Sequence, residues 1–217
     1  MYKNVIFDLD GTLLNTLEDL ADAANWVCAQ HGWPARRLEE YNYFVGNGAP
    51  KLLERVAPPD VELTDALRRQ TLEEFTQRYN AHRSDKTTAY PGMREAVQTL
   101  RDAGLTLAVL SNKPHEAARP VVERYYPGLF HKVQGALPDV PVKPDPTLLR
   151  RLMGEIGASP ADTLFVGDSN VDIRTAKNGG LTSCGVLWGF RTREELEAEG
   201  ADYIVDIAQE LVELILA

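Results

Sequence analysis

The chain has 217 residues, of which 44% are hydrophobic and 25% charged, values typical of one or two globular units with a substantial core. Its formal net charge of -9 argues against binding to nucleic acids or anionic membranes, because both require basic surface patches. The same charge means that long-range attraction will not draw an anionic ligand to the chain, so any anion site must be built from local groups.

The two cysteines, Cys28 and Cys184, form neither a CxxC pair nor a metal-ligand cluster. We therefore expect reduced thiols in a cytoplasmic protein. The N-terminal segment reaches Asp8 and Asp10 almost at once, which is not the pattern of a signal peptide. No apolar stretch approaches the ~18 residues needed to span a bilayer, so we expect no membrane contact.

The first predicted elements are one buried strand and then a run of helices. The strand covers residues 2–7, whose side chains are mostly apolar. Helical spacing of apolar residues and capping signals then predict three helices: residues 17–31, capped by Asn15 or Thr16, a short helix after Gly48, and residues 64–81.

After residue 90, strands alternate with helices. We predict strands at residues 105–110, 132–136, 163–166, 182–187 and 203–205. We predict helices at residues 93–103, 115–125, 146–156, 171–178 and 209–216. This alternation predicts an α/β fold, a Rossmann-like parallel sheet with helices on both faces. The first strand is separated from the others by the helical block, so we assign residues 1–14 and 87–217 to an α/β core and residues 15–86 to an inserted all-helical domain.

Polar side chains follow four of the predicted strands, and the carboxyl ends of parallel strands are where such sheets bind ligands. Asp8 and Asp10 come first, and in an extended segment two such residues point to the same side. Carboxylates so close need a cation, a proton or hydrogen bonds to compensate them. The other three groups are Ser111-Asn112-Lys113, Lys143-Pro144, and Gly167-Asp168-Ser169 with Asp172. We expect all four groups to converge on one site.

In order and context these groups resemble the motifs of the haloacid dehalogenase superfamily, over essentially the whole chain. The residues that carry the resemblance are Asp8-Leu9-Asp10-Gly11-Thr12, Ser111-Asn112, Lys143 and Gly167-Asp168-Ser169 with Asp172. The helical insertion resembles the cap domain of the superfamily's small-molecule phosphatases. The resemblance implies a phosphoric monoester hydrolase that acts on a small phosphorylated metabolite.

The resemblance also implies a role for each residue. Asp8 would be the nucleophile that forms an aspartyl-phosphate, Asp10 would protonate the leaving alcohol and then activate water, and Lys143 would supply positive charge to the phosphoryl group. Mg²⁺ would be held by Asp8, the backbone carbonyl of Asp10, and Asp168, with Asp172 supporting them. Phosphate would be bound by Gly11, Thr12, Ser111, Asn112 and Lys143.

Specificity is expected to come from the helical domain. The loop Gly46-Asn47-Gly48 resembles the cap loop of the phosphoglycolate phosphatase subgroup, and its amides could meet an anion. On local grounds it is equally well read as a plain turn. Lys51 and Arg55, one turn apart, could reach a substrate carboxylate or simply face solvent. Lys113, beside the phosphate loop, is the better candidate. We expect 2-phosphoglycolate as the substrate and a monomer or homodimer.

Three alternatives remain open. A sugar phosphomutase similar to β-phosphoglucomutase would use the same core, but such enzymes usually carry a His in the first cap helix, where this chain has Leu20. A haloalkanoate dehalogenase needs neither Asp10 nor a metal, so Asp10 and Asp168 argue against it. From another class, the chain could be a phosphate-binding regulatory module without turnover.

Overall fold

The computed structural model describes residues 2–217 and divides into two compact units. One unit is made of two stretches of the chain, Met1–Asn15 and Ala89–Ala217, and the other is the continuous stretch Thr16–Thr88. The first unit is an α/β domain and the second is helical.

A six-stranded sheet forms the centre of the α/β unit, and each neighbouring pair of its strands is parallel. Strand β1 lies inside the sheet and is buried along its whole length, as expected for a parallel strand covered on both faces. The order is β5 (Lys132–Ala136), β4 (Thr106–Pro114), β1 (Asn4–Phe7), β6 (Thr163–Gly167), β7 (Thr182–Val186) and β8 (Tyr203–Val205). The predicted Rossmann-like α/β class is confirmed.

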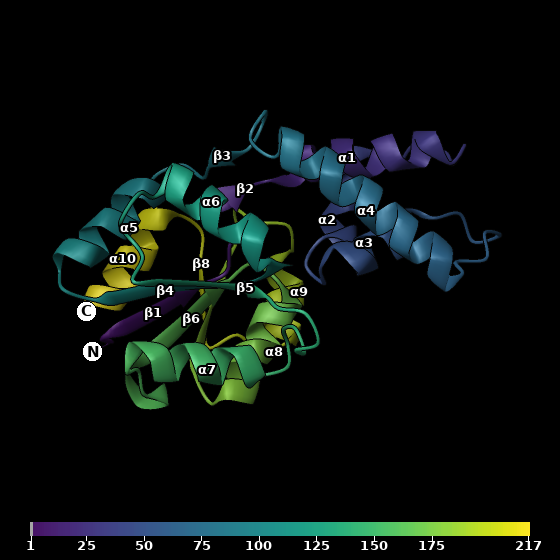
Figure 1. Cartoon of the computed structure of the whole chain (residues 1–217). Coiled ribbons are helices and arrows are strands. Elements are labelled where there is room, and N and C mark those ends of the chain that lie inside the picture. Colours follow the sequence, from purple (N-terminus) through teal and green to yellow (C-terminus); the bar gives the residue numbers. More distant parts are fainter. Residues whose placement is uncertain (1) are drawn as a thin grey trace. The chain divides into compact units, whose positions relative to one another are not determined.

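Helices cover both faces of this sheet (Figure 1). Successive residues of β1 face opposite sides, so that Phe7 joins one apolar core and Ile6 the other. The Phe7 side is covered by α5 (Met93–Asp102), α6 (His115–Tyr125) and α10 (Ala208–Leu216). The Ile6 side is covered by α7 (Thr147–Ile156) and α8 (Asn170–Gly179). The short helix α9 (Arg193–Ala198) packs against α8, and a single 3-10 turn, η1 (Pro160–Asp162), precedes β6.

The register of the sheet brings the predicted motifs to one edge. Phe7 pairs with Val109 on one side and Val166 on the other, so Asp8 lies level with the residues that follow both partners. Strand β4 was expected to end at Leu110 but continues to Pro114. The prediction fell short because pairing with β5 resumes after a register shift, through Pro114. Ser111, Asn112 and Lys113 therefore lie in an irregular strand end rather than in a loop.

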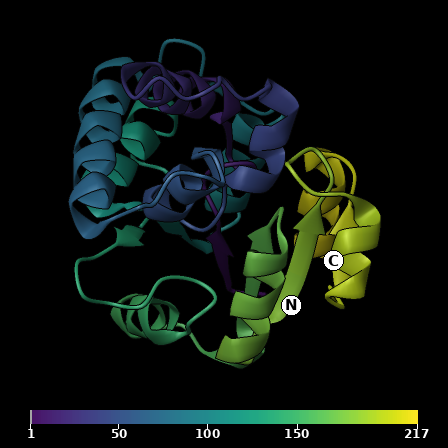
Figure 2. The same cartoon turned by 90° about the vertical axis from the view of Figure 1, so that its right-hand side faces the viewer.

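The helical unit contains four helices: α1 (Leu17–Gln30), α2 (Leu38–Phe44), α3 (Ala49–Val56) and α4 (Asp65–His82), seen as the purple and blue coils of Figures 1 and 2. Asp19, in the first turn of α1, is buried and joins the beginning of the helical unit to its end. Its carboxylate accepts hydrogen bonds from the backbone N–H groups of Lys86 (3.0 Å) and Thr87 (2.9 Å) and from the Thr87 hydroxyl (2.6 Å). The first and last segments of the helical unit are therefore tied to each other.

Some elements were not predicted. Helix α2 is short and has one buried residue, Tyr41, so its apolar periodicity is weak. Helix α9 is equally short, but a signal for it exists, because Thr192 and Glu195 form a capping box at its start. The two-residue strands β2 (Leu14–Asn15) and β3 (Thr88–Ala89), which pair with each other, are too short to show a period.

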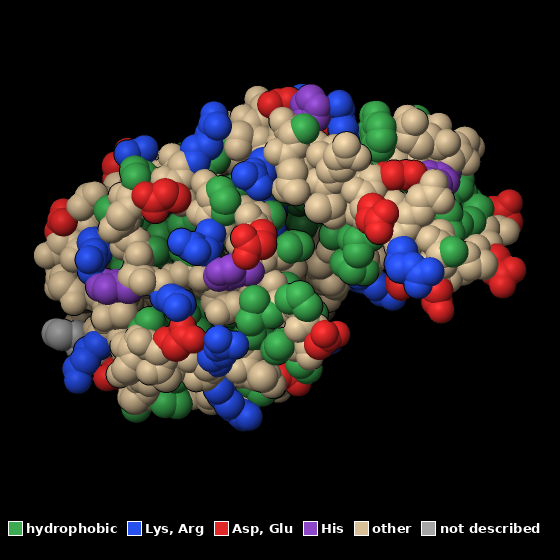
Figure 3. Space-filling model, in the orientation of Figure 1, with side chains coloured by type: hydrophobic (Ala, Val, Ile, Leu, Met, Phe, Trp, Pro, Cys, Tyr) green, Lys and Arg blue, Asp and Glu red, His purple; other side chains and the backbone are tan. Residues whose placement is uncertain are grey.

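Charged side chains on the face shown in Figure 3 are interspersed, with lysines and arginines among the acidic residues. Within residues 2–217, none of the helices has the length and apolarity required to cross a bilayer.

Candidate active site

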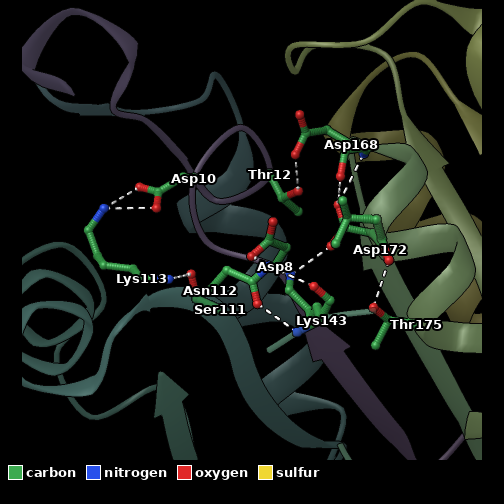
Figure 4. Close-up of polar contacts among 12 residues, drawn as sticks. Asp8, Asp10, Thr12, Ser111, Asn112, Lys113, Lys143, Asp168, Asp172 and Thr175 are labelled. Atoms are coloured by element: carbon green, nitrogen blue, oxygen red, sulfur yellow. Dashed lines mark hydrogen bonds and ion pairs between the residues drawn. The ribbon is translucent and has the colours of Figure 1, made fainter. Parts of the chain in front are cut away.

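Asp8 follows β1 directly and is fixed by the sheet. Its backbone N–H donates to the carbonyl oxygen of Val166 at 2.9 Å, which continues the pairing of β1 with β6 beyond the strand end. The side chain is buried, and its Oδ1 atom lies 2.8 Å from Nζ of Lys143 (Figure 4). The predicted nucleophile therefore lies against a cation at the carboxyl edge of the sheet.

Lys143 is held from both ends. The side-chain amide of Asn112 donates to its carbonyl oxygen (3.0 Å) and accepts from its backbone N–H (2.8 Å). Its Nζ contacts Asp172 Oδ1 at 2.7 Å as well as Asp8. Burial opposes a charge on this lysine, but the carboxylates of Asp172 and Asp8 outweigh it and raise the pKa of Lys143 above its ordinary value. Lys143 is therefore a buried, permanently charged ammonium group.

Asp172 supports this ammonium. Its Oδ1 atom faces Lys143, while its Oδ2 atom accepts hydrogen bonds from the backbone N–H (3.0 Å) and hydroxyl (2.6 Å) of Ser169. Ser169 is the residue that precedes α8, so the same carboxylate holds the lysine and the start of this helix.

Asp168 is fixed by two donors from separate segments. The Thr12 hydroxyl donates to its Oδ1 atom (3.0 Å), and the backbone N–H of Phe190 donates to Oδ2 (2.9 Å). Burial, followed by the charge of Asp172, raises the pKa of Asp168 to about 7. Gly11 makes the close approach possible, because its φ is +91° and a Cβ there would lie 2.4 Å from Asp168 Oδ2.

The cluster of carboxylates fits a metal ion. Each of Asp8, Asp168 and Asp172 offers an oxygen, and these oxygens lie within 4.8 Å of one another. Burial and the charge of Asp172 also raise the pKa of Asp8 well above its usual value, although Lys143 opposes this. Within residues 2–217, Asp8 Oδ1 accepts no directed hydrogen bond despite its contact with Lys143. A buried all-oxygen donor set with more negative charge than one ammonium can balance is what a hard divalent cation requires.

Asp10 and Lys113 form a second ion pair beside this cluster. Lys113 Nζ lies 2.7 Å from Oδ1 and 2.8 Å from Oδ2 of Asp10, so one ammonium contacts both carboxylate oxygens. The Lys113 side chain is 4% exposed and the Asp10 side chain 13%. Next to them, the Ser111 hydroxyl accepts a hydrogen bond from the backbone N–H of Lys113 (3.2 Å), which leaves its own proton able to point at a ligand.

Comparisons with known proteins decide the family. The family model described as haloacid dehalogenase-like hydrolase matches residues 5–186. The chain belongs to the haloacid dehalogenase-like hydrolases. That match runs from β1 through β7 and so includes every motif described above.

Relatives narrow the class of hydrolase. The phosphoglycolate phosphatase of Pseudomonas syringae pv. syringae is 34% identical over 97% of this chain and 78% of its own length. That of Vibrio vulnificus (strain YJ016) is 34% identical over 99% of this chain and 96% of its own length. This haloacid dehalogenase-like hydrolase is thus a phosphatase that acts on phosphoric monoesters, as the sequence predicted.

Solved structures agree with this assignment. A predicted phosphoglycolate phosphatase from Haemophilus somnus is 29% identical, with a TM-score of 0.90 over 98% of this chain and 97% of that chain. CbbY from Rhodobacter sphaeroides, solved in complex with phosphate, is 25% identical, with a TM-score of 0.81 over 97% of this chain and 96% of that chain.

One segment of this hydrolase was missed by sequence reasoning: residues 187–191, which follow β7. Trp188 Nε1 donates to the carbonyl oxygen of Thr12 at 2.9 Å, and Phe190 donates to Asp168 as described. Between them, Gly189 lies so close to Asp168 that a Cβ added there would be 2.2 Å from Asp168 Cβ. The first contact joins residues 176 positions apart and the second joins residues 22 positions apart, so no local sequence pattern predicts them.

The substrate-binding candidates of the helical unit contact other residues of the same unit. Gly46, Asn47 and Gly48 lie between α2 and α3. The Arg55 guanidinium donates to the carbonyl oxygen of Phe44 (2.8 Å) and to Asn47 Oδ1 (2.8 Å), so it holds this loop. Lys51 Nζ lies 2.6 Å from Glu54 Oε2 on the exposed side of α3. A role for Lys51 or for the loop in substrate binding stays a prediction.

Proposed function

We propose that this chain is a Mg²⁺-dependent phosphomonoesterase that works through an aspartyl-phosphate on Asp8, with 2-phosphoglycolate as its substrate. The observation that carries the proposal is the cluster at the end of β1. There a buried carboxylate lies 2.8 Å from a buried ammonium, and its oxygen lies within 4.8 Å of oxygens from two further aspartates.

The first half of the reaction transfers the phosphoryl group. A carboxylate oxygen of Asp8 attacks phosphorus, and the bond from phosphorus to the ester oxygen breaks while Asp10 gives that oxygen a proton. Lys143 lies against Asp8 and offers its charge to the phosphoryl oxygens as they gain negative charge. Ser111 offers its hydroxyl proton to another of these oxygens.

The second half hydrolyses the intermediate. Asp10, now deprotonated, takes a proton from water as the water oxygen attacks phosphorus, and the bond from phosphorus to Asp8 breaks. Inorganic phosphate and the free enzyme result. The same carboxylate thus serves as acid and then as base, while Asp8 alternates between free and phosphorylated forms.

Mg²⁺ fits the chemistry of the donor set, and Asp8, Asp168 and the backbone carbonyl of Asp10 would hold it, with Asp172 supporting Lys143 beside it. When bound, the ion would supply positive charge that compensates the carboxylates and the phosphoryl group. The contacts of Asp168 with Thr12 and Phe190 support its role as a ligand, because they fix the orientation of its carboxylate.

The helical unit is proposed to act as the cap domain that carries further specificity for the leaving group. Its insertion between β2 and β3 and the loop held by Arg55 support this role. The free, buried thiols of Cys28 and Cys184 support a reducing, cytoplasmic location. A small phosphorylated metabolite is the proposed partner, and a monomer or homodimer remains the prediction for the assembly.

Hydrolysis assays test the proposal. Purified protein with Mg²⁺ is expected to release phosphate from 2-phosphoglycolate, and Asp8→Asn, which keeps the shape but removes the nucleophile, is expected to abolish release. Asp102→Asn, an exposed residue of α5, is the matched control and is expected to retain the wild-type rate.

Each other outcome is informative. Wild-type protein that hydrolyses no phosphomonoester with Mg²⁺ would refute the phosphatase and favour a phosphate-binding module. Transfer of phosphate between positions of a sugar without net release would indicate a mutase. Substantial hydrolysis by Asp8→Asn would rule out the aspartyl-phosphate.

A further inference from the structure

Lys113 is a buried lysine that the proposed reaction does not use. Its side chain is 4% exposed, and lysine is among the residues least often buried, because removing an ammonium from water is costly unless a charge compensates it. Here the compensating charge is Asp10, the proposed acid and base. A cation thus lies next to the group that is proposed to handle the proton of the leaving alcohol.

The proposed reaction limits how far this ammonium can lie from the ester oxygen of a bound substrate. A general acid must come within about 3 Å of the ester oxygen that it protonates. Because Lys113 Nζ lies 2.7 and 2.8 Å from the two oxygens of Asp10, the ester oxygen of a bound substrate lies no more than about 6 Å from Nζ. The ammonium is therefore within reach of the first atoms of the leaving alcohol.

Simple covalent geometry then selects a substrate class. When the carbon bonded to the ester oxygen carries a carboxylate, the carboxylate oxygens lie about 3 Å from the ester oxygen. A carboxylate that turns toward Lys113 can therefore come within about 3 Å of Nζ, which is the length of a charge-assisted hydrogen bond. An uncharged alcohol would place nothing ionic within reach of Nζ.

The other buried lysine of the site is committed elsewhere. Lys143 contacts Asp8 and Asp172 within the three-carboxylate cluster, so its charge is directed at the phosphoryl group. The chain carries a net charge of -9, so a second negative group on the substrate needs a local cation of its own. Lys113 is placed to be that cation.

We propose that Lys113 recognises a carboxylate on the leaving alcohol, attached to the carbon that bears the ester oxygen, so that the enzyme selects phosphate esters of 2-hydroxy acids. This inference rests on the proposed function, and 2-phosphoglycolate is the smallest member of the class. By contacting Asp10 as well, Lys113 links recognition of the carboxylate to the position of the acid that acts beside it.

The test compares two substrates that differ in the carboxylate alone. These are 2-phosphoglycolate and ethyl phosphate, each assayed with Mg²⁺ for kcat and KM. Replacing Lys113 by Met keeps an unbranched apolar side chain of similar volume and removes the charge. We expect the ratio of kcat/KM for 2-phosphoglycolate to that for ethyl phosphate to fall by between about 10-fold and 100-fold, the range for losing one hydrogen bond to a charged group.

The comparison separates recognition from positioning. Any loss on ethyl phosphate reports the broken contact with Asp10, whereas the additional loss on 2-phosphoglycolate reports the missing carboxylate contact and is expected mainly in KM. Lys113→Arg, which keeps the charge, is expected to restore part of the ratio. Lys132→Met is the matched control, since Lys132 on β5 forms an exposed ion pair with Glu155 at 2.7 Å, and this variant should leave the ratio unchanged.

Failure of the inference is distinct from failure of the proposed function. Wild-type protein that hydrolyses both esters with no preference, or a Lys113→Met variant that loses both activities equally, would overturn the role of Lys113 and leave the phosphatase intact. Wild-type protein inactive on both esters would overturn the proposed function. In that case calorimetry still tests the role of Lys113, because it measures the affinity of wild type and of Lys113→Met for each of the two esters. An affinity for 2-phosphoglycolate that is the same in both proteins would refute recognition by Lys113. If Lys113→Met does not fold, Lys113→Gln takes its place.

Discussion

Replacing Gly189 by alanine tests whether the segment after β7 holds Asp168, the proposed metal ligand, in place. A Cβ at this position would lie 2.2 Å from Asp168 Cβ and 2.5 Å from the carbonyl oxygen of Gly11. Ordinary contacts between carbon atoms are about 3.5–4.0 Å. The new methyl group is therefore trapped between the Asp168 side chain and the backbone of the Asp8–Thr12 loop, and at least one of them must move by more than about 1 Å.

We expect both the stability of the protein and its affinity for the metal to fall. Overpacking of this kind costs about 1–3 kcal/mol of folding free energy. Asp168 takes its orientation from Thr12 and Phe190, and displacing it breaks one or both of these hydrogen bonds. Loss of such supporting contacts lowers metal affinity by about 10–100-fold. A misplacement of about 1 Å also lowers kcat by about 100-fold.

Calorimetric titration with Mg²⁺ measures the affinity without relying on turnover, and urea unfolding in EDTA measures the stability. Gly154→Ala is the control, because a Cβ there meets nothing within 4 Å and the residue lies inside helix α7. This control is expected to keep the wild-type affinity and to gain about 0.5–1 kcal/mol from improved helix propensity. A Gly189→Ala variant with wild-type affinity and stability would refute the reasoning, because it would mean that the segment moves aside without cost to Asp168.

Three further predictions concern the charges of the site and the loop of the helical unit. Lys143→Met leaves buried carboxylates without their ammonium partner, so the metal-free protein should lose about 3–5 kcal/mol of unfolding free energy in urea and regain part of it with Mg²⁺; stability equal to wild type in EDTA would contradict this. Burial and neighbouring charge raise the pKa values of Asp8 and Asp168, the latter to about 7, so the folded protein binds protons more tightly than the unfolded chain. The unfolding free energy in EDTA should therefore fall as pH rises from about 5 to 7, by up to about 1.4 kcal/mol per unit for each group, and bound Mg²⁺ should remove this slope; a flat or rising profile in EDTA would refute it. Arg55→Met removes the donors to Phe44 and Asn47 and should speed amide exchange across residues 44–48, as read by mass spectrometry; unchanged exchange there would show that the loop holds itself.

The sequence alone was sufficient for the fold class and for the core motifs. Alternation of apolar strands with amphipathic helices predicted the parallel sheet, because strand and helix impose different periods on the same chain. The short gap between Asp8 and Asp10, and the polar residues after three other strands, predicted one site, because parallel strands end at the same edge of the sheet. What failed locally were the shortest elements: α2, β2 and β3 have too few residues for a period, although the capping box of Thr192 could have revealed α9.

Only the tertiary structure decided which groups touch. Sequence reasoning placed Lys113 near the phosphate loop but did not pair it with Asp10, and it passed over Trp188, Gly189 and Phe190 altogether. Partners such as Thr12 and Trp188 are 176 residues apart, and their contact depends on the register of β1, β6 and β7 rather than on any neighbour in sequence. The sequence thus determined the chemistry that the site can perform, because it fixes which groups stand at strand ends. The fold determined the charge balance among them, since ion pairing and burial depend on distances that only packing sets.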